Sequence, residues 1–120
     1  MYRDLDMVVL CNGETASAAE VFAATMRDYQ LAPIVGETTY GKGIMQRVIN
    51  LSTLGNYSGY LRLTTHAYVT KCGETYHNIG VSPSEGLSVE PSEEAKKYGL
   101  QGLEQSKDPQ LQMAFSQFTR

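Results

Sequence analysis

The first third of the chain places a helix-favouring stretch between two short apolar runs. Residues 7–11 are continuously apolar and end at Asn12-Gly13, a strong turn signal, and residues 33–36 form the second run. Continuous apolar runs of this length are typical of strands that are buried on both faces of a sheet. Residues 16–29 lie between the two runs and favour a helix. This order predicts a strand–helix–strand unit, right-handed if the strands are parallel, and hence an α/β fold.

Further elements are expected beyond residue 40. They are strands at residues 47–51 and 60–69, a turn at 56–59, an extended segment over 80–91 and a helix at 92–98. The segment at 60–69 is rich in β-branched and aromatic residues, so we expect it to be the longest strand. Asp108 is a good N-cap and Pro109 suits the first helical position, which predicts a final helix. Its apolar stripe would comprise Leu111, Ala114, Phe115 and Phe118.

Length and composition limit the classes of protein to consider. With 120 residues, of which 42% are hydrophobic and 19% charged, the chain suits one soluble domain with a modest core. The net charge of −3 and the dispersed basic residues argue against a nucleic-acid surface. No apolar run is long enough to span a bilayer, and residues 1–4 show no secretory signal pattern. Cys11 and Cys72 form no metal-binding spacing, so we expect no zinc site, and Cys11 should be a core residue.

Ser17 stands at the predicted turn from strand to helix. A serine hydroxyl becomes a nucleophile when a base removes its proton and amide donors stabilise the developing oxyanion. The first turn of a helix offers unpaired N–H groups for this purpose, and alanines around Ser17 leave room for a substrate. The residue can instead be an N-cap, because Glu20 lies three positions further on, at capping-box spacing. The local pattern alone favours the cap, with Glu20 as a capping or surface carboxylate.

Lys42 is bracketed by two glycines, which allow unusual backbone angles and close packing. Neighbours such as Tyr40 and Met45 could shield its amine from water, and a desolvated lysine has a lowered pKa and can act as a general base. Gln46 could orient the amine by accepting a hydrogen bond. The commoner alternative is a solvated loop lysine. A phosphate-binding loop is disfavoured, because Gly43 stands where that motif requires Ser or Thr.

Four ordered blocks of sequence occur at fitting separations, at residues 8–20, 35–43, 63–68 and 76–83. They read VVLCNGETASAAE, VGETTYGKG, LTTHAY and YHNIGVSP. On these blocks the chain resembles the C-terminal processing peptidases, also called tail-specific proteases, of serine peptidase family S41. The resemblance covers roughly residues 5–90, and the ending from Asp108 onward is similar as well.

The resemblance implies a Ser-Lys dyad, in which Ser17 is the nucleophile, Lys42 the general base and Gln46 the residue that orients the lysine. The backbone amide of Ala18 would be one oxyanion donor. It further implies a bacterial serine endopeptidase that cleaves proteins near their C-terminal ends without metal or cofactor. Its substrates would be the C-terminal tails of proteins or peptides, and it would work outside the cytoplasm, in the periplasm, the cell envelope or the medium.

The implied fold is α/β, a ClpP/crotonase-like core with a sheet flanked by helices, of which residues 1–120 would be the C-terminal portion. The PDZ domain and the N-terminal half of the core would be absent, together with the second oxyanion donor. We therefore expect this portion alone to be poorly active or inactive. Surface that the missing half would cover favours self-association, so a homo-oligomer is expected.

The chain departs from the family pattern at one place in the fourth block. Family members usually have Gly-Lys or similar where this chain has Asn78-Ile79.

Two other functions remain open on the sequence. A crotonase-like acyl-CoA enzyme would place backbone amides around a thioester and would not require both Ser17 and Lys42. A peptidase-like domain retained for binding or assembly would need neither residue. The joint presence of Ser17, Lys42 and Gln46 favours an active enzyme over a degenerate one.

Overall fold

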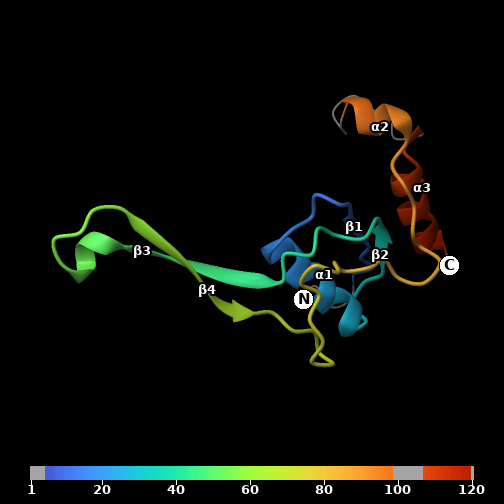
Figure 1. Ribbon diagram of the computed structural model, residues 1–120. Helices are drawn as coiled ribbons and strands as arrows, with labels where there is room; N and C mark the ends of the chain where they lie inside the picture. The colour runs from blue at the N-terminus through green and yellow to red at the C-terminus, as the bar shows by residue number, and fades with distance from the viewer. Residues whose placement is uncertain (1–4, 99–106, 120) are drawn as a thin grey trace.

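The computed structural model describes residues 5–98 and 107–119 of the chain. Its elements are β1 (Val9–Cys11), α1 (Ala18–Asp28), β2 (Ile34–Gly36), β3 (Ile44–Asn50), the 3-10 helix η2 (Leu51–Leu54), β4 (Tyr60–Ala67), α2 (Glu93–Tyr98), α3 (Pro109–Ser116) and the 3-10 helix η4 (Gln117–Thr119). Figure 1 shows a small body around β1, α1 and β2, from which β3 and β4 project as a long arm. The molecule is 61 Å in its longest dimension.

The predicted strand–helix–strand unit is confirmed. Strands β1 and β2 pair in parallel, with Val9 opposite Ile34 and Cys11 opposite Gly36. Both strands are shorter than the apolar runs that predicted them. Gly36 also forms an isolated parallel bridge with Ser88, so the extended segment after residue 80 runs beside β2. Sheets and helices mixed in this way are consistent with the α/β class.

A small core lies between this sheet and α1, and the chain that returns from the arm closes it. Its buried apolar members are Cys11, Ala23, Ala24, Met26, Ala32, Ile34, Tyr76 and Val81. Cys11 is a core residue, as predicted, and burial raises the pKa of its thiol. The thiol is therefore a small apolar group that packs rather than a reactive one.

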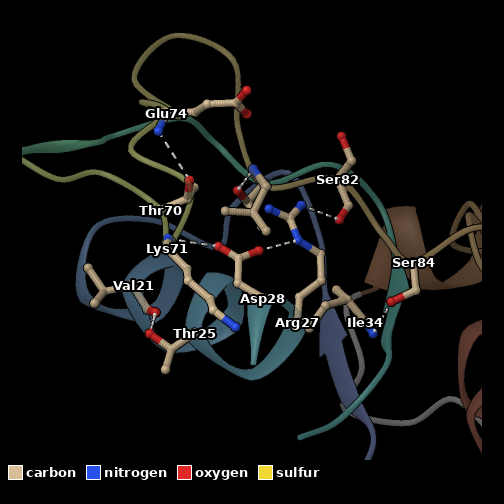
Figure 2. Close-up of polar contacts among 12 residues, drawn as sticks. Val21, Thr25, Arg27, Asp28, Ile34, Thr70, Lys71, Glu74, Ser82 and Ser84 are labelled. Atoms are coloured by element: carbon tan, nitrogen blue, oxygen red, sulfur yellow. Dashed lines mark hydrogen bonds and ion pairs between the residues drawn. The ribbon is translucent and has the colours of Figure 1, made fainter. Parts of the chain in front are cut away.

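Polar contacts hold the returning chain against the C-terminal end of α1 (Figure 2). The Arg27 guanidinium donates to the Ser82 carbonyl at 3.2 Å and pairs with the Asp28 carboxylate at 3.0 Å. Asp28 in turn accepts a hydrogen bond of 3.3 Å from the backbone N–H of Lys71. Further along, the returning chain meets the loop that carries Lys42, where the Asn78 N–H donates to the Gly41 carbonyl at 2.8 Å.

Strands β3 and β4 form an antiparallel hairpin, in which Arg47 is opposite Leu63 and Val48 is opposite Arg62. The strand expected at residues 47–51 begins three residues earlier, and residues 51–54 turn as a 3-10 helix instead. Strand β4 is the longest strand, as predicted, although it ends at Ala67. Every residue of β4 is exposed, because in the described part of the chain the two strands pair only with each other.

The final helix, α3, begins where the sequence predicts. The Asp108 carboxylate accepts hydrogen bonds from the N–H groups of Gln110 and Leu111, at 2.9 and 3.1 Å. The helix lies against β1 and β2, but its expected apolar stripe is only partly covered. Ala114 is buried, whereas Phe115 and Phe118 remain about half exposed, because the parallel sheet beneath has only two strands among the described residues. No helix among the described residues is long and apolar enough to cross a membrane.

Candidate active site

Ser17 is half-buried at the point where the loop after β1 enters α1. Its backbone has φ 56° and ψ −117°, a conformation that residues with a Cβ adopt at a cost of about 1–3 kcal/mol. Ser17 and Glu20 are placed as in a capping box, but the Ser17 hydroxyl makes no N-cap hydrogen bond of ordinary geometry. A strained serine at a helix N-terminus, whose hydroxyl makes no hydrogen bond of ordinary geometry, is compatible with a nucleophile as well as with a cap.

Glu20 is the buried centre of this region, with a side chain that is 0% exposed. One carboxylate oxygen, Oε2, accepts hydrogen bonds from the backbone N–H of Ser17 and of Lys42, both at 2.8 Å. The other, Oε1, accepts from the Thr39 hydroxyl and the Gly41 N–H, both at 2.6 Å. A single ionised side chain therefore links the turn that carries Ser17 to the loop that carries Lys42.

This role was not predicted, because the Ser-x-x-Glu spacing indicates a capping or surface carboxylate. The Ser-x-x-Glu spacing explains only the bond to Ser17; the other three bonds come from residues 19 to 22 positions away. The available signal was weak: a carboxylate in the first turn of a helix, followed after one strand by a glycine-rich loop with free N–H groups. Only the packing of that loop onto α1 identifies Glu20 as the link.

Glu20 should titrate below its ordinary range. Burial by itself raises the pKa of this carboxyl, but the hydrogen bonds from Thr39, Gly41, Ser17 and Lys42 outweigh burial and hold the pKa below its usual value. In the unfolded chain a glutamate titrates near ~4.3, so its contribution to folding is present above that pH and lost as the pH falls through the lower folded value. We expect a carboxyl titration by carbon-13 NMR to place Glu20 below ~4.3. A measured value at or above that point contradicts the assignment.

The two glycines that flank Lys42 show the unusual backbone angle and the close packing that the sequence predicts. Gly41 has φ +87°, and a Cβ on Gly43 would lie 2.8 Å from the backbone nitrogen of His77. The loop is thus pressed against the returning chain, and the His77 ring nitrogen Nδ1 lies 3.2 Å from the Gly41 carbonyl oxygen. The expected shielding of the amine is wrong for this chain, since Lys42 is exposed and Tyr40 is 66% exposed. The backbone of Lys42 is fixed by Glu20, but its side chain lies open to solvent.

Gln46 and Ala18 complete the set of predicted site residues. Gln46 follows a β-bulge at the base of the hairpin, and its amide donates to the Thr64 hydroxyl at 3.4 Å. In the described residues it makes no hydrogen bond to Lys42. Ala18 is the first residue of α1, where the backbone N–H has no carbonyl one turn earlier to receive it. Its amide is therefore placed beside Ser17 as an oxyanion donor would be.

Ser17, Lys42 and Gln46 lie along one open cleft of about 340 Å³ at the base of the hairpin. Its other lining residues are Ile44, Met45, Val48, Arg62 and Tyr68. A second hollow, of about 230 Å³, lies beside α1 near Asp28 and Lys71, in the region drawn in Figure 2, and contains none of the predicted site residues. The fold thus gathers the serine, the lysine and the glutamine from three segments into the first cleft, which is the candidate active site.

The chain is similar to known proteins both in sequence and in fold. The family model for peptidase family S41 matches residues 2–86. A carboxy-terminal-processing protease of Bartonella bacilliformis is 37% identical over 94 residues, covering 78% of this chain and 21% of the relative. A chloroplastic C-terminal processing peptidase of Tetradesmus obliquus is 43% identical over 84 residues, covering 70% of this chain and 17% of the relative.

A solved structure of a photosystem II D1 C-terminal processing protease superposes with a TM-score of 0.61 at 39% identity, covering 72% of this chain and 21% of that one. The chain spans about a fifth of the length of these relatives. The family match covers most of the chain, and the relatives agree with it in sequence and in fold. The chain belongs to peptidase family S41.

Proposed function

We propose that this chain is the C-terminal portion of a serine endopeptidase that cleaves proteins near their C-terminal ends through a Ser-Lys dyad. The observation that carries the proposal is the Glu20 carboxylate, which binds the backbone nitrogens of Ser17 and Lys42 with the same oxygen. These two hydrogen bonds hold the backbones of Ser17 and Lys42, the proposed nucleophile and base, at the same cleft. The names of the relatives, which are C-terminal processing proteases, support the substrate class.

The chemistry follows from the positions of the three groups. The Ser17 Oγ attacks the scissile carbonyl while its proton passes to the Lys42 Nζ, and the Ala18 N–H donates to the resulting oxyanion. Lys42 returns that proton to the leaving amine as the peptide bond breaks and an acyl-Ser17 ester remains. A water molecule, deprotonated by Lys42, then hydrolyses the ester and restores both residues. Gln46 would orient the amine once the cleft is covered.

Within the α/β class, we propose that the fold is the ClpP/crotonase-like core, with residues 1–120 as the C-terminal portion of the catalytic domain. A PDZ domain and the N-terminal half of the core would lie elsewhere in the full-length peptidase. The exposed Lys42 and the single oxyanion donor fit this division. Removing one oxyanion donor typically costs about 10²–10³ in turnover, so we expect the isolated chain to be poorly active. We place the full-length protein outside the cytoplasm, in line with the processing role of its relatives.

The test is Ser17→Ala in the full-length peptidase. Loss of proteolysis with an intact fold supports the dyad, and retained proteolysis refutes it. Turnover of an acyl-CoA thioester that survives Ser17→Ala would instead assign the crotonase-like function. Absence of both activities in the unaltered protein would assign a binding or assembly role.

We further propose that the isolated chain forms a homo-oligomer through the outer face of its hairpin. That face carries Ile49, Leu61 and Leu63, which lie opposite the side that lines the cleft. Leu61 and Leu63 are 42% and 41% exposed, and the outer edges of β3 and β4 are unpaired in the described part of the chain. Open edges and apolar faces promote association between copies.

Light scattering over a concentration series should therefore show a dimer or larger species. The double variant Leu61→Lys with Leu63→Lys should shift the distribution toward monomer, since two charges would have to be buried at the interface. Leu31→Lys, at an exposed position on the body, is the matched control and should leave the distribution unchanged. A monomer at every concentration in the unaltered chain would rule out this interface.

A further inference from the structure

Among the described residues, Arg62 is the one cation besides Lys42 that lines the candidate active-site cleft. Arg62 lies opposite Val48 in the hairpin and two residues before Thr64 on β4. The Thr64 hydroxyl accepts a hydrogen bond from the Gln46 amide. Side chains two apart on a strand project from the same face, with a separation of about 7 Å along it. Arg62 therefore sits one strand step beyond Gln46, on the face of the hairpin that continues the cleft.

The guanidinium has no carboxylate partner in the described part of the chain. Arg27 pairs with Asp28, and Lys96 pairs with Glu90 and Glu93, so these carboxylates bind cations other than Arg62. The sequence from residue 38 to residue 73 contains no aspartate and no glutamate at all, although the chain has 13 acidic residues. The charged side chains of the arm and of the cleft lining are thus all cationic.

The remaining walls of the cleft are apolar, formed by Ile44, Met45, Val48 and Tyr68. An unpaired guanidinium at the end of an apolar groove binds a carboxylate well, because its planar fork can donate two parallel hydrogen bonds. We propose that Arg62 is a specificity-determining residue that binds a carboxylate of the peptide substrate. This inference rests on the proposed function, since it assigns a peptide to the same cleft. The carboxylate is either the free C-terminus of the peptide or an aspartate or glutamate side chain.

The chain supplies a matched control in Arg47. It lies on β3 opposite Leu63, so it projects from the other face of the same hairpin and does not line the cleft. Arg47 and Arg62 are both exposed residues of exposed strands, with the same charge and a similar distance from the body. General attraction of an acidic peptide to the arm would depend on both residues, whereas recognition in the cleft depends on Arg62 alone.

The experiment measures peptide binding to the Ser17→Ala form of this chain by fluorescence anisotropy, so that no cleavage is needed. Three fluorescent peptides share one apolar sequence: one ends in a free carboxylate, one in an amide, and one in an amide with a glutamate near its end. The two carboxylate-bearing peptides should bind more tightly than the neutral one. The tighter of the two shows whether Arg62 binds the free C-terminus or an acidic side chain. Arg62→Gln should weaken that binding by about 10- to 100-fold, Arg62→Lys should restore part of it, and Arg47→Gln should leave it unchanged.

Equal losses in Arg62→Gln and Arg47→Gln would overturn the assignment, as would equal binding of the neutral peptide or the lack of any binding tighter than about 1 mM. Circular dichroism of each variant checks that the hairpin is retained. Failure of the proposed dyad is a separate result, because it shows as retained proteolysis in the Ser17→Ala peptidase and does not alter the binding readout.

Discussion

Glu20→Ala should lower the free energy of unfolding of this chain by about 3–5 kcal/mol. The variant removes the acceptor for four donors at once, which are the N–H groups of Ser17, Gly41 and Lys42 and the hydroxyl of Thr39. Each buried donor left without a partner costs about 1–3 kcal/mol, partly relieved where water can enter. Because small domains are stable by only about 5–15 kcal/mol, the loss is expected to be plain in urea unfolding followed by circular dichroism.

A graded pair of variants keeps this prediction testable if Glu20→Ala does not fold. Glu20→Gln preserves the shape and one acceptor oxygen but turns an amide N–H₂ toward two donors, so it should destabilise by an intermediate amount, about 1–3 kcal/mol. Glu14→Gln changes an exposed carboxylate three residues before Ser17 and should stay within about 0.5 kcal/mol of the unaltered chain. Stabilities of Glu20→Ala and Glu14→Gln that agree would show that the bonds of Glu20 carry no folding free energy.

Ser17→Ala in the full-length peptidase should reduce kcat by about 10⁴-fold or more, with the fold unchanged. Alanine keeps the Cβ and the same backbone strain at φ 56°, so the variant removes the nucleophile and little else. Lys42→Ala should cause a loss of similar size, because the hydroxyl then has no base. The double variant should be no slower than the worse single variant, since two residues that act as one unit do not contribute additively.

Two controls separate chemistry from structure in that series. Lys71→Ala removes a lysine beside the second hollow, where its amine lies 4.7 Å from the centre of the Tyr29 ring, and should leave kcat unchanged. Ser17→Gly relieves the positive φ and should raise stability by about 1 kcal/mol while abolishing turnover. Substantial cleavage by Ser17→Ala, measured as kcat on an unfolded protein substrate, would remove Ser17 from the mechanism.

Much of the local structure was predictable from the sequence. The strand–helix–strand unit, the Asp108 cap and the conformational demand on Gly41 depend on neighbouring residues, and the structure confirms all three. The strand ends were predicted less well. Leu51 left the expected strand because the Asn50 side chain accepts a hydrogen bond from the Ser52 N–H and starts a 3-10 turn. Such short-range competition between a side chain and the sheet ladder is hard to rank from composition.

The alternating apolar and polar residues of β4 correctly predicted a strand, but not which other elements would cover its faces. Alternating apolar residues are typical of a strand with one covered face, yet Leu61 and Leu63 are exposed in this chain. Whether a face is covered depends on which other element packs there, and within the described residues none lies on this one. Lys42 differs from expectation for the same reason, because apolar neighbours in sequence shield an amine only when the chain folds over it.

The sequence by itself determined the types of group available for catalysis: a serine at a strand-to-helix turn, a lysine between glycines, and a glutamine four residues beyond it. Only the tertiary structure decided that they share a cleft, and that Glu20 extends beyond its local cap to bind the loop of Lys42. The physical reason is that a capping box is satisfied within one helical turn, whereas a buried carboxylate must find donors for all its lone pairs. Those donors lie on a loop that long-range packing brings onto the helix.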